Sequence, residues 1–152
     1  MLRKGTVAQL KSGELTREQA YLAVVMRHYP RGIAKELIDE YCSELSPPAA
    51  LLKEFLATRK KLGPHNTAFQ ACGYERKFTL THAAIDELRR LSELSAQRDV
   101  VLICQCALNE RCHRELLLIA ARRWFSARTE LRAFSYPGWE ARLTDTPGEI
   151  LS

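Results

Sequence analysis

The sequence predicts an α/β fold with a mostly parallel central sheet flanked by helices. Two short apolar runs, Tyr21–Met26 and Asp99–Cys104, have the β-branched composition of strands that are buried on both faces. Segments with helical spacing separate and follow these runs, and strands that alternate with helices are typical of βαβ units. We therefore expect a single α/β domain over residues 1–152, a Rossmann-like three-layer arrangement with its core at about 4–135 and an irregular tail at about 136–152.

The first half of the chain contains two expected strands and two expected helices. A weak apolar stretch at 5–10 precedes the stronger strand at Tyr21–Met26. Leu37, Ile38 and Tyr41 would share one face of a helix over 34–41. The next helix begins at Ser46-Pro47-Pro48, because serine suits the N-cap and proline suits the first helical turn. Its apolar face consists of Leu51, Leu52, Phe55 and Leu56.

The second half begins with a basic connector, 59–77, which contains a short expected helix at 67–72. Thr79 or Thr81 caps a longer helix that runs to Ser95. Its inward residues are Ala84, Ile85, Leu88, Leu91 and Leu94. The strand Asp99–Cys104 then leads into a helix at 113–124. A modest alternation predicts a last strand at 129–134, before two Pro-Gly pairs interrupt the tail.

Composition indicates a soluble protein with a bias toward anionic partners. The net charge of +5 comes from 16 arginines and only seven lysines, and arginine binds phosphate and carboxylate groups in a bidentate manner. A genome of high GC content would enrich arginine just as well. The apolar runs are too short to cross a bilayer, and the N-terminus has no apolar signal core. The five cysteines form no disulfide framework, so we expect a cytoplasmic protein with reduced thiols and no membrane partner.

Two polar loops follow the two strongest strands. One is Arg27–Gly32 and the other is Cys104–Arg114, which ends at the start of a helix. If the strands are parallel, both loops leave the same edge of the sheet, where ligand sites of α/β proteins form. We therefore expect the two arginine-rich loops to converge on one pocket.

At these loops the chain resembles the bacterial domain-of-unknown-function family 488. Arg27–Gly32 is similar to the family's Arg-x-Trp-Pro-Arg-Gly signature, with Tyr29 in place of tryptophan, and 38–47 is similar to the Trp-x-Lys-Glu-Leu-Ala-Pro-Ser region that follows it. Leu102-Ile103-Cys104 and Cys112-His113-Arg114 resemble the Leu-Leu-Cys…Cys-His-Arg block of another branch of the family. The usual acidic residue after the first cysteine is replaced by Gln105-Cys106. The resemblance covers about 4–135 and implies a compact α/β fold of bacterial, cytoplasmic origin, without naming a reaction.

The first candidate site binds an anion. Arginine side chains and the free backbone amides at a helix start could together hold a phosphate or carboxylate group, and a tyrosine could stack on a base. The residues concerned are Arg27, Tyr29, Arg31, Arg111 and Arg114. The alternative is that these arginines form structural ion pairs with Asp39, Glu110 or Glu115.

The second candidate is a reactive thiol. Cys112 stands at a helix N-terminus between an arginine and His113, a setting that lowers a thiol pKa and makes the sulfur nucleophilic. The spacing differs from the Cys-x5-Arg of tyrosine phosphatases. Cys106 to Arg111 has the rhodanese-like Cys-x4-Arg length but lacks a glycine in the loop. Small cysteines buried in a tight turn would explain the same residues.

A metal site is the third reading of the cysteines. Cys104, Cys106, Cys112 and His113 could supply four ligands to zinc, but adjacent ligands close a tetrahedron poorly. We expect no metal and no cofactor. Among the other histidines, His28 is a candidate acid or base, whereas His65 and His82 read as residues without a chemical role.

The function we expect is that of an enzyme acting on a nucleotide or nucleic acid, with Cys112 or His113 in the chemistry. Two other functions fit the same residues: a non-catalytic module that binds nucleic acid or senses an effector, and a thiol-based rhodanese-like or redox activity at Cys112. An anionic small molecule or a nucleic acid is the expected partner, and the oligomeric state stays open.

Overall fold

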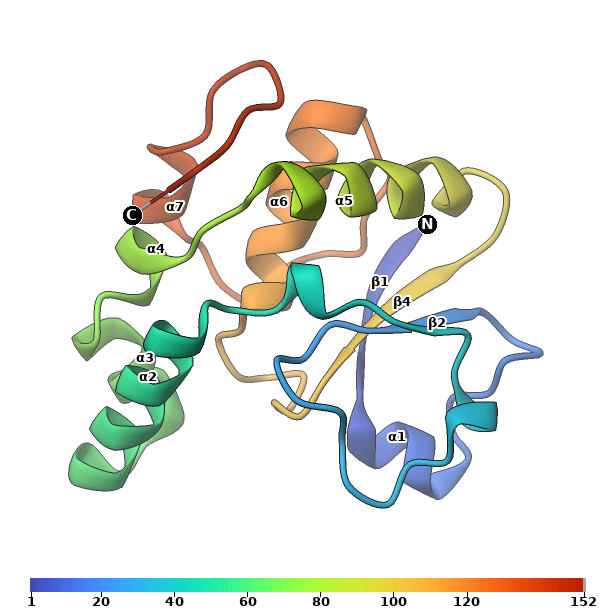
Figure 1. The fold of residues 1–152 in the computed structure, drawn as a ribbon, viewed down its shortest axis with the longest axis horizontal. Coiled ribbons are helices and arrows are strands. Elements are labelled where there is room, and N and C mark those ends of the chain that lie inside the picture. Colours follow the sequence, from blue (N-terminus) through green and yellow to red (C-terminus); the bar gives the residue numbers. More distant parts are fainter. Residues whose placement is uncertain (152) are drawn as a thin grey trace.

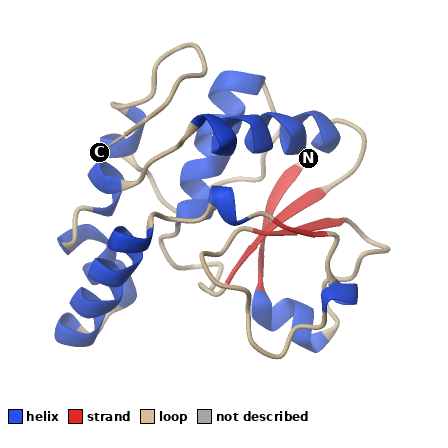
Figure 2. Cartoon of the chain, viewed as in Figure 1, coloured by secondary structure: helices blue, strands red, loops and turns tan. Residues whose placement is uncertain are grey.

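A four-stranded parallel sheet forms the centre of the computed structural model, which describes residues 1–151. The strands, which are red in Figure 2, are β1 (Leu2–Thr6), β2 (Tyr21–Val24), β3 (Glu40–Tyr41) and β4 (Val100–Cys104). Their spatial order is β1-β4-β2-β3. The predicted α/β fold with a parallel sheet is confirmed. Strands β2 and β4 are hydrogen-bonded neighbours, so the segments that follow them leave the same edge.

Helices cover both faces of this sheet. They are α1 (Val7–Ser12), α2 (Ala49–Leu62), α3 (His65–Ala71), α4 (Tyr74–Lys77), α5 (His82–Ser95), α6 (His113–Phe125) and α7 (Pro137–Glu140), with 3₁₀ turns at Lys35–Leu37 and Ser43–Leu45. Helices α5 and α6 lie on one face and α1 lies on the other, while α2 and α3 form a separate layer beside the sheet (Figure 1). Among residues 1–151, no helix combines the length and apolar composition that a membrane span requires.

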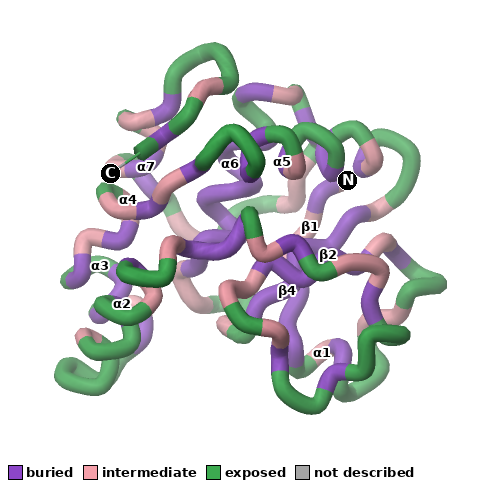
Figure 3. The backbone as a smooth tube through the Cα atoms, in the orientation of Figure 1, coloured by how far each residue is buried: buried purple, intermediate pink, exposed green. Residues whose placement is uncertain are grey.

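The sheet divides the hydrophobic core into a larger and a smaller cluster. All five residues of β4 are buried, as Figure 3 shows for the central strands. Val100 and Leu102 point into the larger cluster, with α5 and α6, whereas Val101 and Ile103 point into the smaller one, with α1. A strand with apolar contacts on both faces has a continuous run of apolar residues, and for this reason the sequence predicts β4 clearly.

Three predicted elements are wrong. The strand expected at 5–10 is the end of β1 followed by α1, which begins because Thr6 and Gln9 form a reciprocal capping box. The helix expected at 34–41 is a 3₁₀ turn and the edge strand β3, where Asp39 accepts a hydrogen bond from the backbone of Leu22. The strand expected at 129–134 reduces to one bridge between Leu2 and Thr129.

Candidate active site

The two loops converge on one pocket at the carboxyl edge of the sheet, as the parallel arrangement predicts. The pocket has a volume of about 350 Å³ and lies between these loops and helices α2 and α3. Its lining combines apolar and aromatic side chains with charged groups and cysteines. The lining residues include Arg27, Phe55, Arg59, His65, Cys104, Cys106, Glu110, Arg111, Cys112 and His113.

Cys112 lies on the floor of the pocket, directly before the first turn of α6. Its side chain is only 2% exposed. The Sγ atom is 3.3 Å from Nε of Arg114 and 3.4 Å from Nδ1 of His113. Two nitrogen donors and the positive end of a helix dipole therefore face one sulfur, which is a setting that stabilises a thiolate.

The charge of this cluster sets the pKa of Cys112. Burial by itself raises the pKa of the thiol, but hydrogen bonds from Cys104 and Cys106 and the positive charges of Arg114 and His113 outweigh it. The pKa of Cys112 therefore lies well below the ordinary thiol value. The pKa of Cys106 is raised by its hydrogen bonds to Cys104 and Cys112 and by burial, so this second sulfur keeps its proton.

His113 connects the two strand ends. Its Nε2 atom lies 2.7 Å from the carbonyl oxygen of Val25, which follows β2. Because a carbonyl can only accept, Nε2 carries a proton. Burial lowers the pKa of His113, but the charge of the Cys112 thiolate and the interactions with the sulfurs of Cys112 and Cys104 outweigh this and raise the pKa to about 10. The imidazole is therefore protonated at neutral pH and donates from both nitrogens.

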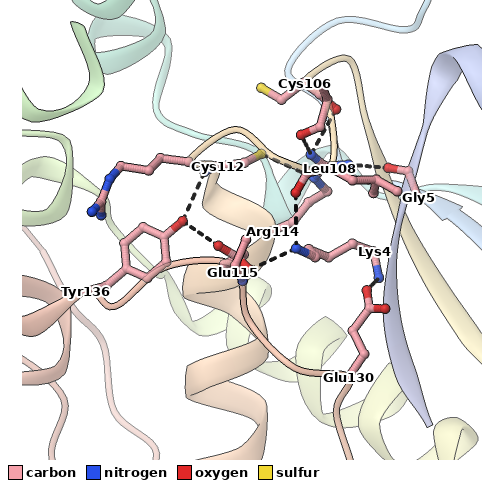
Figure 4. Close-up of polar contacts among 12 residues, drawn as sticks. Lys4, Gly5, Cys106, Leu108, Cys112, Arg114, Glu115, Glu130 and Tyr136 are labelled. Atoms are coloured by element: carbon pink, nitrogen blue, oxygen red, sulfur yellow. Dashed lines mark hydrogen bonds and ion pairs between the residues drawn. The ribbon is translucent and has the colours of Figure 1, made fainter. Parts of the chain in front are cut away.

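Arg114 is fully buried beneath Cys112. Its guanidinium donates to the carbonyl oxygens of Gly5, Cys106 and Ala107, the last two at 2.9 and 3.1 Å (Figure 4). Arg114, an expected anion ligand, is not among the residues that line the pocket, and backbone carbonyls and the sulfur of Cys112 occupy its donors. Arg114 holds the loop after β4 and faces the thiolate instead.

A second buried network supports the backbone at Cys112. The hydroxyl of Tyr136 accepts from the Cys112 backbone N–H at 3.3 Å and donates to Oε1 of Glu115 at 2.7 Å (Figure 4). The other carboxylate oxygen of Glu115 lies 2.8 Å from Nζ of Lys4 on β1. The sequence does not indicate Tyr136 and suggests Glu115 only as an alternative partner for arginine, because Glu115 lies 21 residues from Tyr136 and 111 residues from Lys4.

Three arginines line the pocket. Arg27 donates through Nε and Nη2 to the carbonyl of Pro47, and Arg111 donates to the carbonyl of Ser135 and lies over the ring of Phe134. Arg59, which belongs to the predicted basic connector, is exposed and reaches the pocket from α2. Arg27 and Arg111 therefore lie at the pocket, as expected. Arg59 lies there too, although in the sequence it belongs to an exposed basic cluster with no predicted role.

Two expected anion ligands lie elsewhere. Neither Tyr29 nor Arg31 is among the residues that line the pocket. Tyr29 packs edge-on against Tyr41 with ring centroids 5.4 Å apart, and its buried hydroxyl has no hydrogen-bond partner within residues 1–151. Arg31 is exposed at the following turn. The Arg27–Gly32 loop turns away from the pocket after His28, so only its first part contributes.

His65, for which the sequence predicted no chemical role, is one of the residues that line the pocket. It is buried at the start of α3, and its ring packs edge-on against Phe55 with centroids 5.0 Å apart. Nε2 lies 2.8 Å from the carbonyl of Arg111 and must donate to it, so Nδ1 is the nitrogen that lacks a proton whenever the ring is neutral. Within residues 1–151 Nδ1 makes no hydrogen bond, and it lies 3.3 Å from a carboxylate oxygen of Glu110.

The sulfur atoms of Cys104, Cys106 and Cys112 all lie within 4.8 Å of one another, and those of Cys104 and Cys106 are 3.9 Å apart. The chain bends at Gln105 and Cys106, directly after β4, and the Cys106 sulfur lies with the other two. Three sulfurs at this separation could hold a soft metal ion such as zinc. The cationic side chains of Arg114 and His113 next to Cys112 oppose a metal cation there and favour a thiolate that is hydrogen-bonded to its neighbours.

Comparison with known proteins supports the resemblance that the two loops indicated. No curated protein and no solved structure matches the chain significantly. A sequence model of the family DUF488-N3a, described as the active DUF488-N3 subclade, matches residues 6–125 and so includes every strand after β1 and both pocket loops. The chain therefore belongs to the DUF488-N3a family.

Proposed function

We propose that this protein is an enzyme that uses the Cys112 thiolate as a nucleophile against an anionic substrate. The observation that carries the proposal is the position of Cys112 Sγ on the pocket floor, 3.3 Å from the Arg114 guanidinium and 3.4 Å from the His113 imidazole. A thiolate is the reactive form of cysteine, and this arrangement favours it at neutral pH. The description of the matched family as an active subclade agrees with an enzymatic role.

The pocket walls support an anionic substrate with an apolar or aromatic part. Arg27, Arg59 and Arg111 line the pocket against a single carboxylate, that of Glu110. One guanidinium nitrogen of Arg27 makes no contact with Pro47, and Arg59 is exposed to solvent. The aromatic lining residues, such as Phe55, offer apolar contacts. A nucleotide combines a phosphate group, which arginine binds, with a flat base, which aromatic side chains contact.

The experiment uses two small alkylating reagents of the same reactivity class and different charge. Neutral iodoacetamide and anionic iodoacetate are applied to the native protein, and labelling of Cys112 is followed by peptide mapping. The proposal predicts that Cys112 favours iodoacetate relative to a free cysteine in solution. Arg59→Gln should reduce the iodoacetate rate and leave the iodoacetamide rate unchanged, whereas Arg122→Gln, on the outer face of α6, should change neither. Equal preference at Cys112 and at free cysteine contradicts an anion-binding pocket.

A second candidate function, the binding of nucleic acid without catalysis, has one observation in its favour. Lys60 and Lys61 are exposed and continue the basic surface from Arg59. A polyanion held by this surface would lose affinity steeply as salt concentration rises, with contributions from many basic residues. A Cys112→Ser variant that keeps full affinity for single-stranded oligonucleotides, in a protein whose Cys112 is slow to alkylate, would favour this alternative.

A further inference from the structure

Cys106 is placed to react with Cys112. Its sulfur lies within 4.8 Å of the Cys112 sulfur, and the side chain is half-buried at the pocket. The Cys104 sulfur also lies within 4.8 Å of Cys112, but Cys104 is the last residue of the central strand β4 and pairs with β1. Cys106 lies in the bend beyond the strand, where it can move without breaking the sheet. Of the two neighbouring thiols, Cys106 is therefore the one that can approach Cys112 to bonding distance.

His65 stands on the other side of Cys106. A ring nitrogen of His65 lies within 4.8 Å of the Cys106 sulfur, and the buried Nδ1, which lacks a proton when the ring is neutral, has no hydrogen-bond partner among the described residues. The ring cannot rotate freely, because Nε2 is held by the carbonyl of Arg111 and the face is packed by Phe55. The carboxylate of Glu110, 3.3 Å from Nδ1, would stabilise the imidazolium that forms on proton uptake. This geometry is that of a base prepared to accept a proton from the Cys106 thiol.

We propose that Cys112 and Cys106 form a redox-active dithiol that reduces hydroperoxides, with Cys112 as the attacking sulfur, Cys106 as the resolving sulfur and His65 as the base for Cys106. The inference rests on the proposed function for the reactivity of Cys112 and adds a second activity. A hydroperoxide is small enough to reach the floor of a pocket of about 350 Å³.

The reaction has two steps. The Cys112 thiolate attacks one oxygen of the hydroperoxide, so that an S–O bond forms, the O–O bond breaks and the alkoxide leaves, taking a proton from solvent. Cys112 is now a sulfenic acid. The Cys106 thiol then gives its proton to His65 Nδ1 and attacks the Cys112 sulfur. The S–S bond forms, the S–O bond breaks, and the departing hydroxide takes the proton from His65 to become water. The two thiols have lost two electrons to the peroxide, and an external dithiol restores them.

The test treats the full chain with hydrogen peroxide and maps its disulfides under non-reducing conditions. The wild-type protein should acquire a Cys106–Cys112 disulfide and should consume peroxide repeatedly when dithiothreitol is present. Cys106→Ser should accumulate sulfenic acid at Cys112, trapped by dimedone, while iodoacetamide still labels Cys112 in the untreated variant. Cys42→Ala, which changes a buried thiol in the core, should behave as the wild type.

His65 provides a second readout. His65→Gln should leave sulfenic acid formation unchanged and slow disulfide closure by roughly 10²-fold, as expected for loss of a general base. Peroxide treatment that gives sulfinic acid at Cys112 without a disulfide, or a disulfide to Cys104 instead, would overturn the inference. If iodoacetamide labels Cys112 readily and no disulfide forms, only this inference fails. If Cys112 does not label at all, the proposed function fails with it.

Discussion

The Nε atom of Arg114 lies 3.3 Å from Sγ of Cys112, and the rest of the guanidinium is held by backbone carbonyls. The cation is fully buried, so its charge acts on the sulfur with little screening by solvent. The backbone acceptors include Gly5 on β1 and two residues of the loop after β4. The Arg114 side chain therefore connects β1 to the loop after β4. It also holds its own positive charge next to the Cys112 sulfur, whose reactivity depends on that charge.

Arg114→Lys tests this relationship. A lysine keeps the charge but cannot bridge three carbonyls and a sulfur, because its ammonium is a point donor and not a planar fork. We expect the free energy of unfolding to fall by about 1–3 kcal/mol, the cost of leaving buried acceptors unpaired, and the pH midpoint of Cys112 alkylation to rise. Urea denaturation and peptide-mapped alkylation measure the two effects. Arg122→Lys is the exposed control, and an unchanged midpoint in Arg114→Lys would exclude a role in thiolate stabilisation.

Gly5→Ala tests how closely β1 approaches β4. A Cβ atom at residue 5 would lie 2.5 Å from Cγ1 of Val101 and 2.7 Å from Cδ1 of Leu15, so the side chains around it would have to move. We expect a loss of about 1–3 kcal/mol in the free energy of unfolding, which is typical of overpacking in a core. Gly148→Ala is the matched control, because no atom lies within 4 Å of its Cβ position. Equal urea midpoints for the two variants would contradict the packing described here.

Two tyrosine hydroxyls with opposite surroundings provide the next comparison. The Tyr136 hydroxyl connects the Cys112 backbone to the buried carboxylate of Glu115, whereas the buried Tyr29 hydroxyl has no hydrogen-bond partner in the part of the chain that the structure describes. Tyr136→Phe should therefore cost about 1–3 kcal/mol of unfolding free energy, and Tyr29→Phe should cost nothing or stabilise the protein. Thermal or urea unfolding of both variants measures the two changes in unfolding free energy. A larger loss from Tyr29→Phe would show that the network at Cys112 contributes little.

The dependence of stability on pH follows from the ion pair of Cys112 and His113. The pKa of the thiol is lowered well below its ordinary 9.0, and that of the imidazole is raised from 6.5 to about 10. The lowered pKa of Cys112 contributes stability that is fully present above pH 9.0 and is lost as pH falls from 9.0 through the pKa of the folded thiol. The raised pKa of His113 contributes stability that is fully present below pH 6.5. Above 9.0 the folded state keeps an extra proton, and stability falls as pH rises through about 10.

His113→Asn should remove the loss on the alkaline side. Urea denaturation of the wild type and the variant between pH 5 and pH 10 measures the difference in the free energy of unfolding at each pH. The wild-type curve should decline more steeply than the variant curve above pH 9. Parallel curves over that range would mean that His113 is neutral in the folded protein.

Much of the fold was accessible from the sequence, because β2, β4, α5 and α6 have strong apolar patterns and buried parallel strands leave continuous apolar runs. The convergence of the two loops was accessible for the same reason. Residues whose role depends on long-range contacts were not. His65 follows a Gly-Pro pair and resembles a loop residue, yet it is buried against Phe55 and the carbonyl of Arg111. Arg114 resembles a ligand-binding arginine, yet backbone carbonyls far apart in sequence use its donors.

The central claim, that Cys112 is a thiolate in the native protein, is tested most directly by the pH profile of its alkylation. Native protein, cleared of bound metal with a chelator, is treated with iodoacetamide across a pH series, and labelling at each cysteine is mapped. Cys42 is the internal control, because burial and the charge of Glu87 raise its pKa to about 12. We predict that Cys112 labels rapidly well below pH 8 while Cys42 does not react. If Cys112 labels no sooner than Cys42, or only after unfolding, the protein has no reactive thiolate at this site.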